Sequence, residues 1–280
     1  MACRTTLAAL CILTCLLLVA APAFCADTAE ERAKLREGLS YRGDADFVWE
    51  HLTPNDDYGD WYSAYLTGYF RVHPRITPFA QLGMHTRELE GEAVTGTVGA
   101  YVNWFRYLST YTALGTGTES LFTPMWRVDH DFTFILGSLP LTFTLGAGHI
   151  QYWDDHHDWY VAAGPTLYLP YFIADYRLTR NESNPGAVES WSHGVTLGVG
   201  SEGLFWIFLG TTFAAQAYTA TNVADRQEVR QDTWEINLSH SHWIGRTWGL
   251  KWQAAYLNLG DPPKSGYEKW TAGIGVFKEF

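Results

Sequence analysis

The chain has 280 residues, of which 47% are hydrophobic and 16% aromatic, and its formal charge at pH 7 is -11. A negative balance of this size argues against a nucleic-acid partner, because phosphate backbones favour basic surfaces. All four cysteines (Cys3, Cys11, Cys15 and Cys25) lie at the start of the chain. A mature protein without this segment keeps at most one of them, which excludes an internal disulfide.

Residues 1–26 have the pattern of a signal peptide. Arg4 precedes an apolar run from Leu7 to Ala20, and the small residues Ala21 and Ala23 follow. The pattern predicts export, with cleavage after Ala23 or slightly later, near Cys25. The bulky Phe24 argues against a lipid-anchored cysteine at position 25.

Residues 27–43 are expected to form a short periplasmic segment. Thr28 and Glu31 have the spacing of a capping box, and Gly38 is a natural helix end, so residues 29–37 are compatible with a short polar helix. A solvated tail without helix is the equal alternative.

Residues 44–280 alternate between apolar and polar side chains with a period of two, which predicts a single all-β domain. Between Phe122 and Leu136 the even positions are mostly apolar, whereas the odd positions include Arg127, Asp129 and Asp131. Segments 61–72 and 139–146 alternate in the same way. Each of these segments therefore has one apolar and one polar face.

The lengths of the expected strands and connections favour a membrane barrel. Most expected strands reach about nine residues, the length needed to cross a bilayer, whereas soluble strands have about 5 to 6. Short connections at 73–75, 137–138, 169–170, 201–203 and 245–247 alternate with longer polar ones at 88–92, 115–120, 153–158, 179–189, 222–229 and 260–266. The pattern predicts an up-and-down antiparallel transmembrane barrel of about 14 strands, or 12 if residues 109–113 are not a separate strand. An even number brings both termini to the periplasmic side.

Aromatic residues near the expected strand ends have the positions of interfacial girdles. They are Trp104, Tyr107, Trp126, Trp159, Tyr168, Tyr171, Trp191, Trp206, Trp243, Trp248 and Trp270.

The last expected strand ends on an aromatic residue. Phe280, Val276 and Ile274 share one face, opposite Gly273 and Gly275. This pattern resembles the C-terminal signature by which the outer-membrane assembly machinery recognises its substrates. Lys278 departs from the signature, but a lysine near the membrane interface can extend its amine to water at a cost of about 0 to 1 kcal/mol.

Four segments together resemble the YaiO family of outer-membrane β-barrel proteins, and the resemblance extends over residues 38–280. They are "GLSYRGDADFVWEHLTPNDDYGDWYSAYLTG", "YVAAGPTLYLPYFIADYRLTR", "VTLGVGSEGLFW" and "GIGVFKEF". The resemblance implies an outer-membrane location and a barrel domain. It supplies no catalytic residues.

Charged residues on the polar faces are the main candidates for function, because a lipid-facing Arg or Lys at the bilayer midplane would cost about 2 to 4 kcal/mol. The expected lumen-lining residues are Arg71, Arg87, Arg127, Asp129, Asp131, Asp175, Arg177, Glu235 and Lys251. They are expected either to form a salt-bridge lattice that stiffens the barrel or to set ion selectivity.

Three motifs suggest other chemistry but lack an essential part. "WDDHHDWY" at 153–160 has no spaced third ligand for a metal. In "RNESNPG" at 180–186 Asn181 stands where a Ser183 nucleophile would need a basic histidine, and in "SHSH" at 239–242 alternation separates serines from histidines. We therefore expect no catalytic residues, no metal and no cofactor.

The sequence thus predicts a monomeric, non-enzymatic pore for small polar solutes in the outer membrane. A structural or polysaccharide-export scaffold is the alternative, and a lipid hydrolase is a weaker one. The expected partners are outer-membrane lipid, lipopolysaccharide and the assembly machinery, the last through Phe280.

Overall fold

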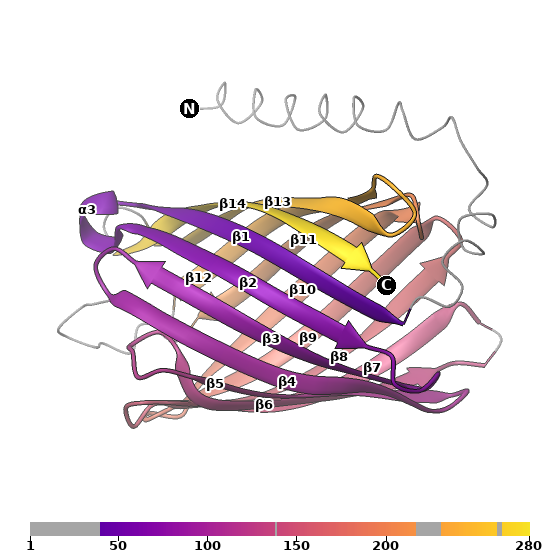
Figure 1. Cartoon of the computed structure of the whole chain (residues 1–280). Coiled ribbons are helices and arrows are strands. Elements are labelled where there is room, and N and C mark those ends of the chain that lie inside the picture. Colours follow the sequence, from indigo (N-terminus) through magenta and orange to yellow (C-terminus); the bar gives the residue numbers. More distant parts are fainter. Residues whose placement is uncertain (1–39, 138, 217–230, 262–264) are drawn as a thin grey trace, which may run out of the picture.

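The computed structural model describes residues 40–137, 139–216, 231–261 and 265–280. In these residues fourteen antiparallel strands form a closed barrel with one short helix (Figure 1). The elements are β1 (Tyr41–Thr53), α3 (Asn55–Tyr58), β2 (Asp60–Phe70), β3 (Ile76–Arg87), β4 (Gly91–Phe105), β5 (Leu108–Gly117), β6 (Pro124–Ile135), β7 (Leu141–Tyr152), β8 (His157–Leu169), β9 (Phe172–Asn184), β10 (Val188–Ser201), β11 (Phe205–Gln216), β12 (Gln231–Trp243), β13 (Trp248–Asp261) and β14 (Ser265–Glu279). The predicted all-β barrel is confirmed with 14 rather than 12 strands, because β5 is a strand of its own.

Each strand pairs with the next one along the chain, and β1 pairs with β14 to close the barrel. The closure includes the last residue, since the amide of Phe280 donates to the carbonyl of Tyr41 at 2.8 Å. The start of β1 and the end of β14 therefore lie at the same end of the barrel, together with the turn after β2. We call this the turn end, which is periplasmic in outer-membrane barrels, and the opposite end the loop end.

The strands extend farther toward the loop end than the sequence predicted. The expected loop 179–189 is mostly strand, because β9 continues to Asn184 and β10 starts at Val188, with Glu182 paired to Glu189. Likewise His157 belongs to β8 rather than to a loop. Polar side chains there indicate contact with water above the membrane and not the end of backbone pairing. The predicted loop 222–229, signal peptide 1–26 and helix 29–37 lie outside the described residues.

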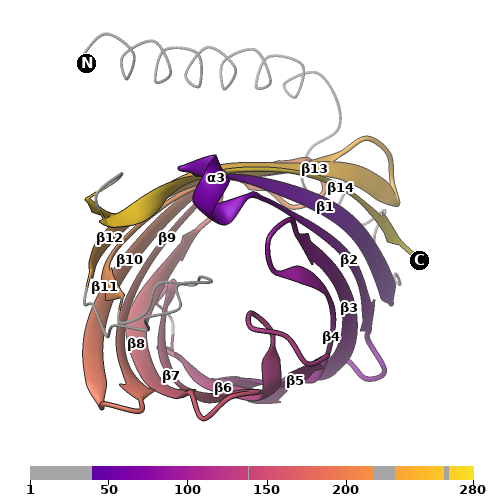
Figure 2. The same cartoon turned by 90° about the vertical axis from the view of Figure 1, so that its left-hand side faces the viewer.

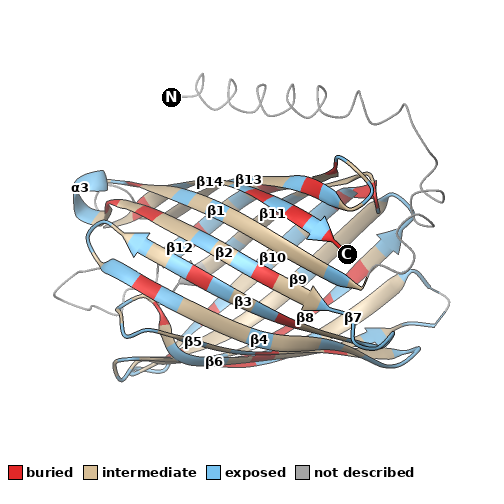
Figure 3. Ribbon diagram, viewed as in Figure 1, coloured by how far each residue is buried: buried red, intermediate tan, exposed pale blue. Residues whose placement is uncertain are grey.

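The outer surface carries the apolar face of the strands. Large apolar side chains are exposed along it, as with Ile274, which is 63% exposed on β14, and they alternate with less exposed residues (Figure 3). A water-soluble protein would bury such a surface, whereas lipid covers it in a membrane. Among the described residues, no helix is long and apolar enough to cross a membrane.

Three expected girdle residues lie on the interior face instead. One is Tyr168, which alternates along β8 with the interior residues Tyr160 and Thr166; the others are two tryptophans. Trp243 is 4% exposed and packs edge-on against the buried Phe277 at 5.0 Å. Trp206 stacks at 5.6 Å on Phe208, which lines the interior. The prediction is wrong for these three residues because a position near a strand end does not determine the face of the strand.

A small hydrophobic cluster partly fills the barrel near the loop end. It consists of Leu52, Trp61, Leu257, Leu259 and Tyr267, with Tyr58 packed against it. Tyr58 belongs to α3, which Figure 2 shows at the rim of the barrel. This cluster anchors the connection between β1 and β2.

Candidate functional site: a charged barrel interior

Contacts between strands that are not neighbours identify the interior face. The guanidinium of Arg177 on β9 donates to Asp131 on β6 at 3.0 Å, although β7 and β8 lie between these strands. Side chains on the convex outer surface diverge, so such a contact passes through the interior. The alternation of each strand then assigns its remaining residues to one face or the other.

The first charged group, which we call the β6–β9 cluster, contains Arg127, Asp129, Asp131, Tyr160 and Arg177. Arg127 Nε lies 2.6 Å from Asp129 Oδ2, and the Tyr160 hydroxyl donates to the other oxygen of the same carboxylate. All five side chains thus belong to hydrogen-bonded pairs or triads that line one wall of the barrel.

Two glycines on β7 provide the space that this cluster occupies. A methyl group added at Gly146 would lie 2.0 Å from Oδ1 of Asp131 and 2.7 Å from the Arg177 guanidinium. At Gly148 it would lie 2.3 Å from the ring of Tyr160. Contacts across β7 therefore depend on positions without a side chain.

A second group, the β1–β13 cluster, repeats this arrangement near the turn end. Lys251 Nζ lies 2.6 Å from Asp44 and 2.8 Å from Asp46, and Arg42 pairs with Asp44 at 2.7 Å. The intervening strand is β14, where a methyl group at Gly275 would lie 2.0 Å from Asp46 Oδ1. Again a glycine lets side chains meet over a strand.

Near the loop end, ion pairs merge with aromatic packing. Lys269 lies 2.6 Å from Glu50, and Arg87 lies 2.7 Å from Glu90. The Arg87 guanidinium also sits 3.8 Å from the ring of Trp61, a geometry that favours a cation–π interaction.

Three other predicted lumen residues have different surroundings. Asp175 accepts a hydrogen bond from Thr166 at 2.5 Å, and Glu235 accepts one from Asn237 at 3.3 Å. Among the described residues neither carboxylate has a cationic partner. Arg71 lies in the exposed turn after β2 and not on a strand, so its polar position in the sequence does not place it on a strand wall.

A polar cavity of about 570 Å³ lies inside the barrel. Its walls come from both sides of the closure, since Gln81 of β3 and Ser239 of β12 both line it. Arg42, Asp46 and Lys251 of the β1–β13 cluster face the same space.

The candidate hydrolase residues are not brought together. Ser183 is buried and accepts from the Asn181 amide at 3.0 Å, and no histidine takes part in that bond. Ser239 faces the interior, whereas His240 packs on the outer side against Trp252, with ring centroids 5.5 Å apart.

In the acidic loop motif, His156 pairs with Asp158 at 3.1 Å, while His157 lies near His149 with ring centroids 5.7 Å apart. Within the described ranges no group of three or more His, Cys, Asp or Glu is arranged to hold a metal.

One serine–histidine contact was missed by the sequence analysis. Ser63 and His85 are paired residues of β2 and β3, and their Oγ and Nδ1 atoms are 3.0 Å apart. The other ring nitrogen of His85 lies 3.0 Å from the Thr95 hydroxyl. A neutral threonine cannot stabilise an imidazolium as a carboxylate does. We therefore interpret the Ser63–His85–Thr95 contacts as a structural hydrogen-bond network in the interior. Only the register between strands could have revealed it.

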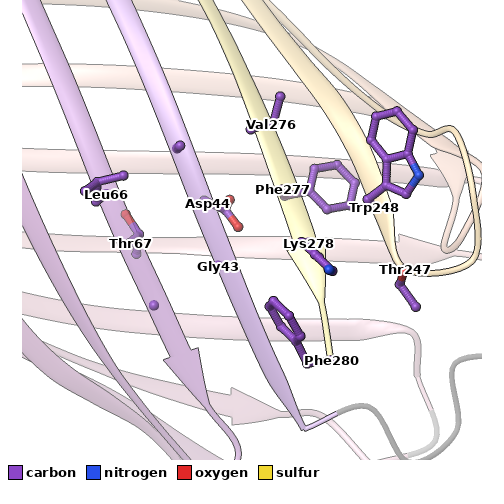
Figure 4. Close-up of a pocket in the computed structure, with 12 residues that line it drawn as sticks. Gly43, Asp44, Leu66, Thr67, Thr247, Trp248, Val276, Phe277, Lys278 and Phe280 are labelled. Atoms are coloured by element: carbon purple, nitrogen blue, oxygen red, sulfur yellow. The ribbon is translucent and has the colours of Figure 1, made fainter.

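The outer wall has an apolar groove of about 860 Å³ beside the closure of β1 and β14 (Figure 4). Leu66, Val276 and Phe280 line it, and the absence of a side chain at Gly43 deepens it. The amine of Lys278 lies 4.8 Å from the ring centroid of Phe280. The departure from the C-terminal signature therefore places a lysine beside an interfacial aromatic ring.

A closed antiparallel barrel with an exposed apolar outer surface and a charged interior defines the class of outer-membrane β-barrel proteins. The model of the YaiO membrane beta barrel domain matches residues 45–218, more than half of the chain. The chain therefore belongs to the YaiO family, as its sequence resemblance predicted, and its location is the outer membrane.

Solved structures with the same fold are distant in sequence. A bacterial polysaccharide outer membrane secretin has a TM-score of 0.53 at 7% identity, over 85% of this chain and 98% of that one. Omp33 of Acinetobacter baumannii has a TM-score of 0.51 at 11% identity, over 87% and 100% of the two chains. An outer membrane channel from Pseudomonas putida F1 has a TM-score of 0.50 at 8% identity, over 86% and 96%. No curated protein matches the chain in sequence.

Proposed function

We propose that the barrel is a non-enzymatic pore for small polar solutes. The observation that supports this most directly is the exposure of interior charged groups: the side chains of Arg127 and Arg177 are 47% and 39% exposed although both point into the barrel. Because both side chains belong to the interior face, this exposure is toward the lumen, which supports a lumen that water can enter. Ion pairs with such exposure contribute about 0 to 1 kcal/mol each, which is little for a purely structural role.

The interior charges also predict the ion selectivity of the proposed pore. Asp175 and Glu235 lack cationic partners among the described residues, whereas Arg127, Arg177 and Lys251 are each paired with carboxylates. Fixed negative charge in a channel with low-dielectric walls raises the local concentration of cations. We therefore expect a preference for cations.

The test is single-channel recording on the purified barrel in a planar bilayer with a KCl gradient. The wild type should conduct, and the double variant Asp129→Asn with Asp131→Asn should shift the reversal potential toward anion preference. A matched control is Glu189→Gln with Glu268→Gln, which removes two carboxylates from the outward faces of β10 and β14. The control should leave the reversal potential unchanged.

A structural scaffold is the second candidate function. The ion pairs over Gly146 and Gly275 favour it, because they connect strands that are not neighbours in the sheet. A wild type that does not conduct, with a double variant that is only less heat-stable, would support this alternative. Hydrolysis of lipid by the pure protein, abolished by His85→Ala, by His240→Ala or by His242→Ala, would contradict both proposals.

A further inference from the structure

Four aromatic side chains form a continuous surface on the wall of β2 to β5, which we call the aromatic ridge: Tyr69, Phe79, Tyr101 and Tyr111. Phe79 is central: its ring centroid lies 6.0 Å from that of Tyr69 and 5.8 Å from those of Tyr101 and Tyr111. Its ring is nearly parallel to that of Tyr111, with an angle of 5°. Tyr101 and Tyr111 are 5.0 Å apart.

Strand register brings these rings together from distant parts of the chain. Tyr69 is paired with Phe79, and Tyr101 with Tyr111. Phe79 lies over Gly99, where a methyl group would be 2.5 Å from the ring. Phe79 is two residues from Gln81, which lines the interior cavity, so the ridge belongs to the interior wall.

The ridge offers a surface and not only a packed core. Phe79 is 9% exposed and forms its base, whereas Tyr101 is 46% exposed. Among the described residues, the hydroxyls of Tyr69, Tyr101 and Tyr111 have no hydrogen-bond partner. Unpaired phenols on a wet wall are free to bind a solute.

Charged residues bound the ridge on both sides. In the strand register, Arg42 of β1 lies directly opposite Tyr69 of β2, and Asp131 of β6 lies directly opposite Tyr111 of β5. The two ion-paired clusters described above therefore meet the ridge at its two edges. The result is an aromatic surface of stacked and tilted rings between hydrogen-bonding rims.

We propose that the aromatic ridge binds saccharides that enter the lumen. A pyranose ring has a flat face of C–H groups, which packs on aromatic rings, and a rim of hydroxyls, which pair with carboxylates and guanidinium groups. A lipid chain would offer these polar rims no hydrogen-bonding group, and a nucleotide phosphate would face the excess of carboxylates. The assignment rests on the proposed pore function and names its substrate class.

The first experiment measures blockage of single-channel current by maltohexaose, a neutral oligosaccharide. Wild-type channels should show transient, concentration-dependent closures. Tyr101→Ala and Tyr111→Ala should each raise the dissociation constant from these closures about tenfold, the effect expected for one stacked ring. Tyr101→Phe keeps the ring and should retain most of the binding. Tyr176→Ala, on the outward face of β9, is the matched control and should bind as the wild type does.

A second measurement separates this proposal from the pore itself. Isothermal titration of the purified barrel with maltohexaose, in a detergent without a sugar headgroup, detects binding whether or not the barrel conducts. Conductance without any binding, or binding that Tyr101→Ala and Tyr111→Ala leave unchanged, would overturn the ridge assignment while the pore stands. Binding that both variants lose, in a barrel without conductance, would support the ridge and reject the pore.

Discussion

At the scale of single residues, the interior depends on positions without side chains as much as on charges. Gly146, Gly148 and Gly275 lie under side chains that meet over a strand. A Cβ at any of these three positions would overlap the contacting side chains, because the pleat points that atom into the lumen. Glycine thus determines which charges pair.

Gly146→Ala tests this role directly. The added methyl would overlap Asp131 and Arg177, so one of them must move and their hydrogen bonds should break. Both clashing groups are the far ends of flexible side chains that can move aside, so the cost should be close to that of the lost ion pair, about 0 to 1 kcal/mol. The variant should lose its heat-resistant gel mobility at a lower temperature than the wild type. Gly96→Ala, where nothing lies within 4 Å of the new methyl, should not.

At the scale of strands, alternation decides what each side chain touches. On β6, Arg127, Asp129 and Asp131 share the interior face, and the apolar Val128 and Phe134 lie on the other. A slip of one residue would exchange the two sets completely.

Cysteine labelling measures that assignment in the membrane. Cysteines at positions 129 and 175 should react with water-soluble thiol reagents, since both lie on the wet interior wall. Cysteines at 128 and 134 should react only with lipid-phase reagents. The opposite labelling would place these strands one residue out of register.

The last strand gives a second prediction, which distinguishes the role of the Phe280 ring from that of the Phe280 backbone. Phe280 accepts a hydrogen bond from the Ser40 amide at 2.7 Å and donates one to Tyr41 through its backbone, while its ring is exposed on the outer side. Phe280→Ala keeps both backbone bonds and removes the ring. If the ring is the assembly signal, this variant should reach the outer membrane at a yield as low as that of a chain lacking Phe280. Phe280→Tyr should assemble normally, and equal yields for all three variants would reject the signal.

At the scale of the whole molecule, closure leaves no strand edge unpaired. β1 is hydrogen-bonded to β14 from Arg42 to Thr53, so the sheet offers no edge to a second copy. We expect a monomer. Light scattering in detergent should give the mass of one chain after subtraction of the micelle, and a dimer or trimer mass would show that the outer surface associates through side chains instead.

The two-residue period by itself determined the fold class and the faces of β6 and β14, because alternation is a local property of extended backbone. The family was predicted from the resemblance of four segments and not from the period. The spacing of the turns predicted about 14 strands, or 12 if residues 109–113 were not a separate strand, and the structure has 14. The sequence could not determine where strands continue above the membrane, as at residues 179–189, since polar residues there mark water and not chain reversal. Nor could it determine which face Trp243 and Trp206 occupy.

Only the tertiary structure decided the neighbours across strands. Arg177 meets Asp131, Ser63 meets His85, and Phe79 meets Tyr111 because closure and stagger of the sheet set the register of residues far apart in the chain. Each residue type was visible in the sequence, and parity predicted the face of the charged residues Arg177 and Asp131. The partner of each residue was not predictable, because pairing depends on the slip between strands, which no local pattern records.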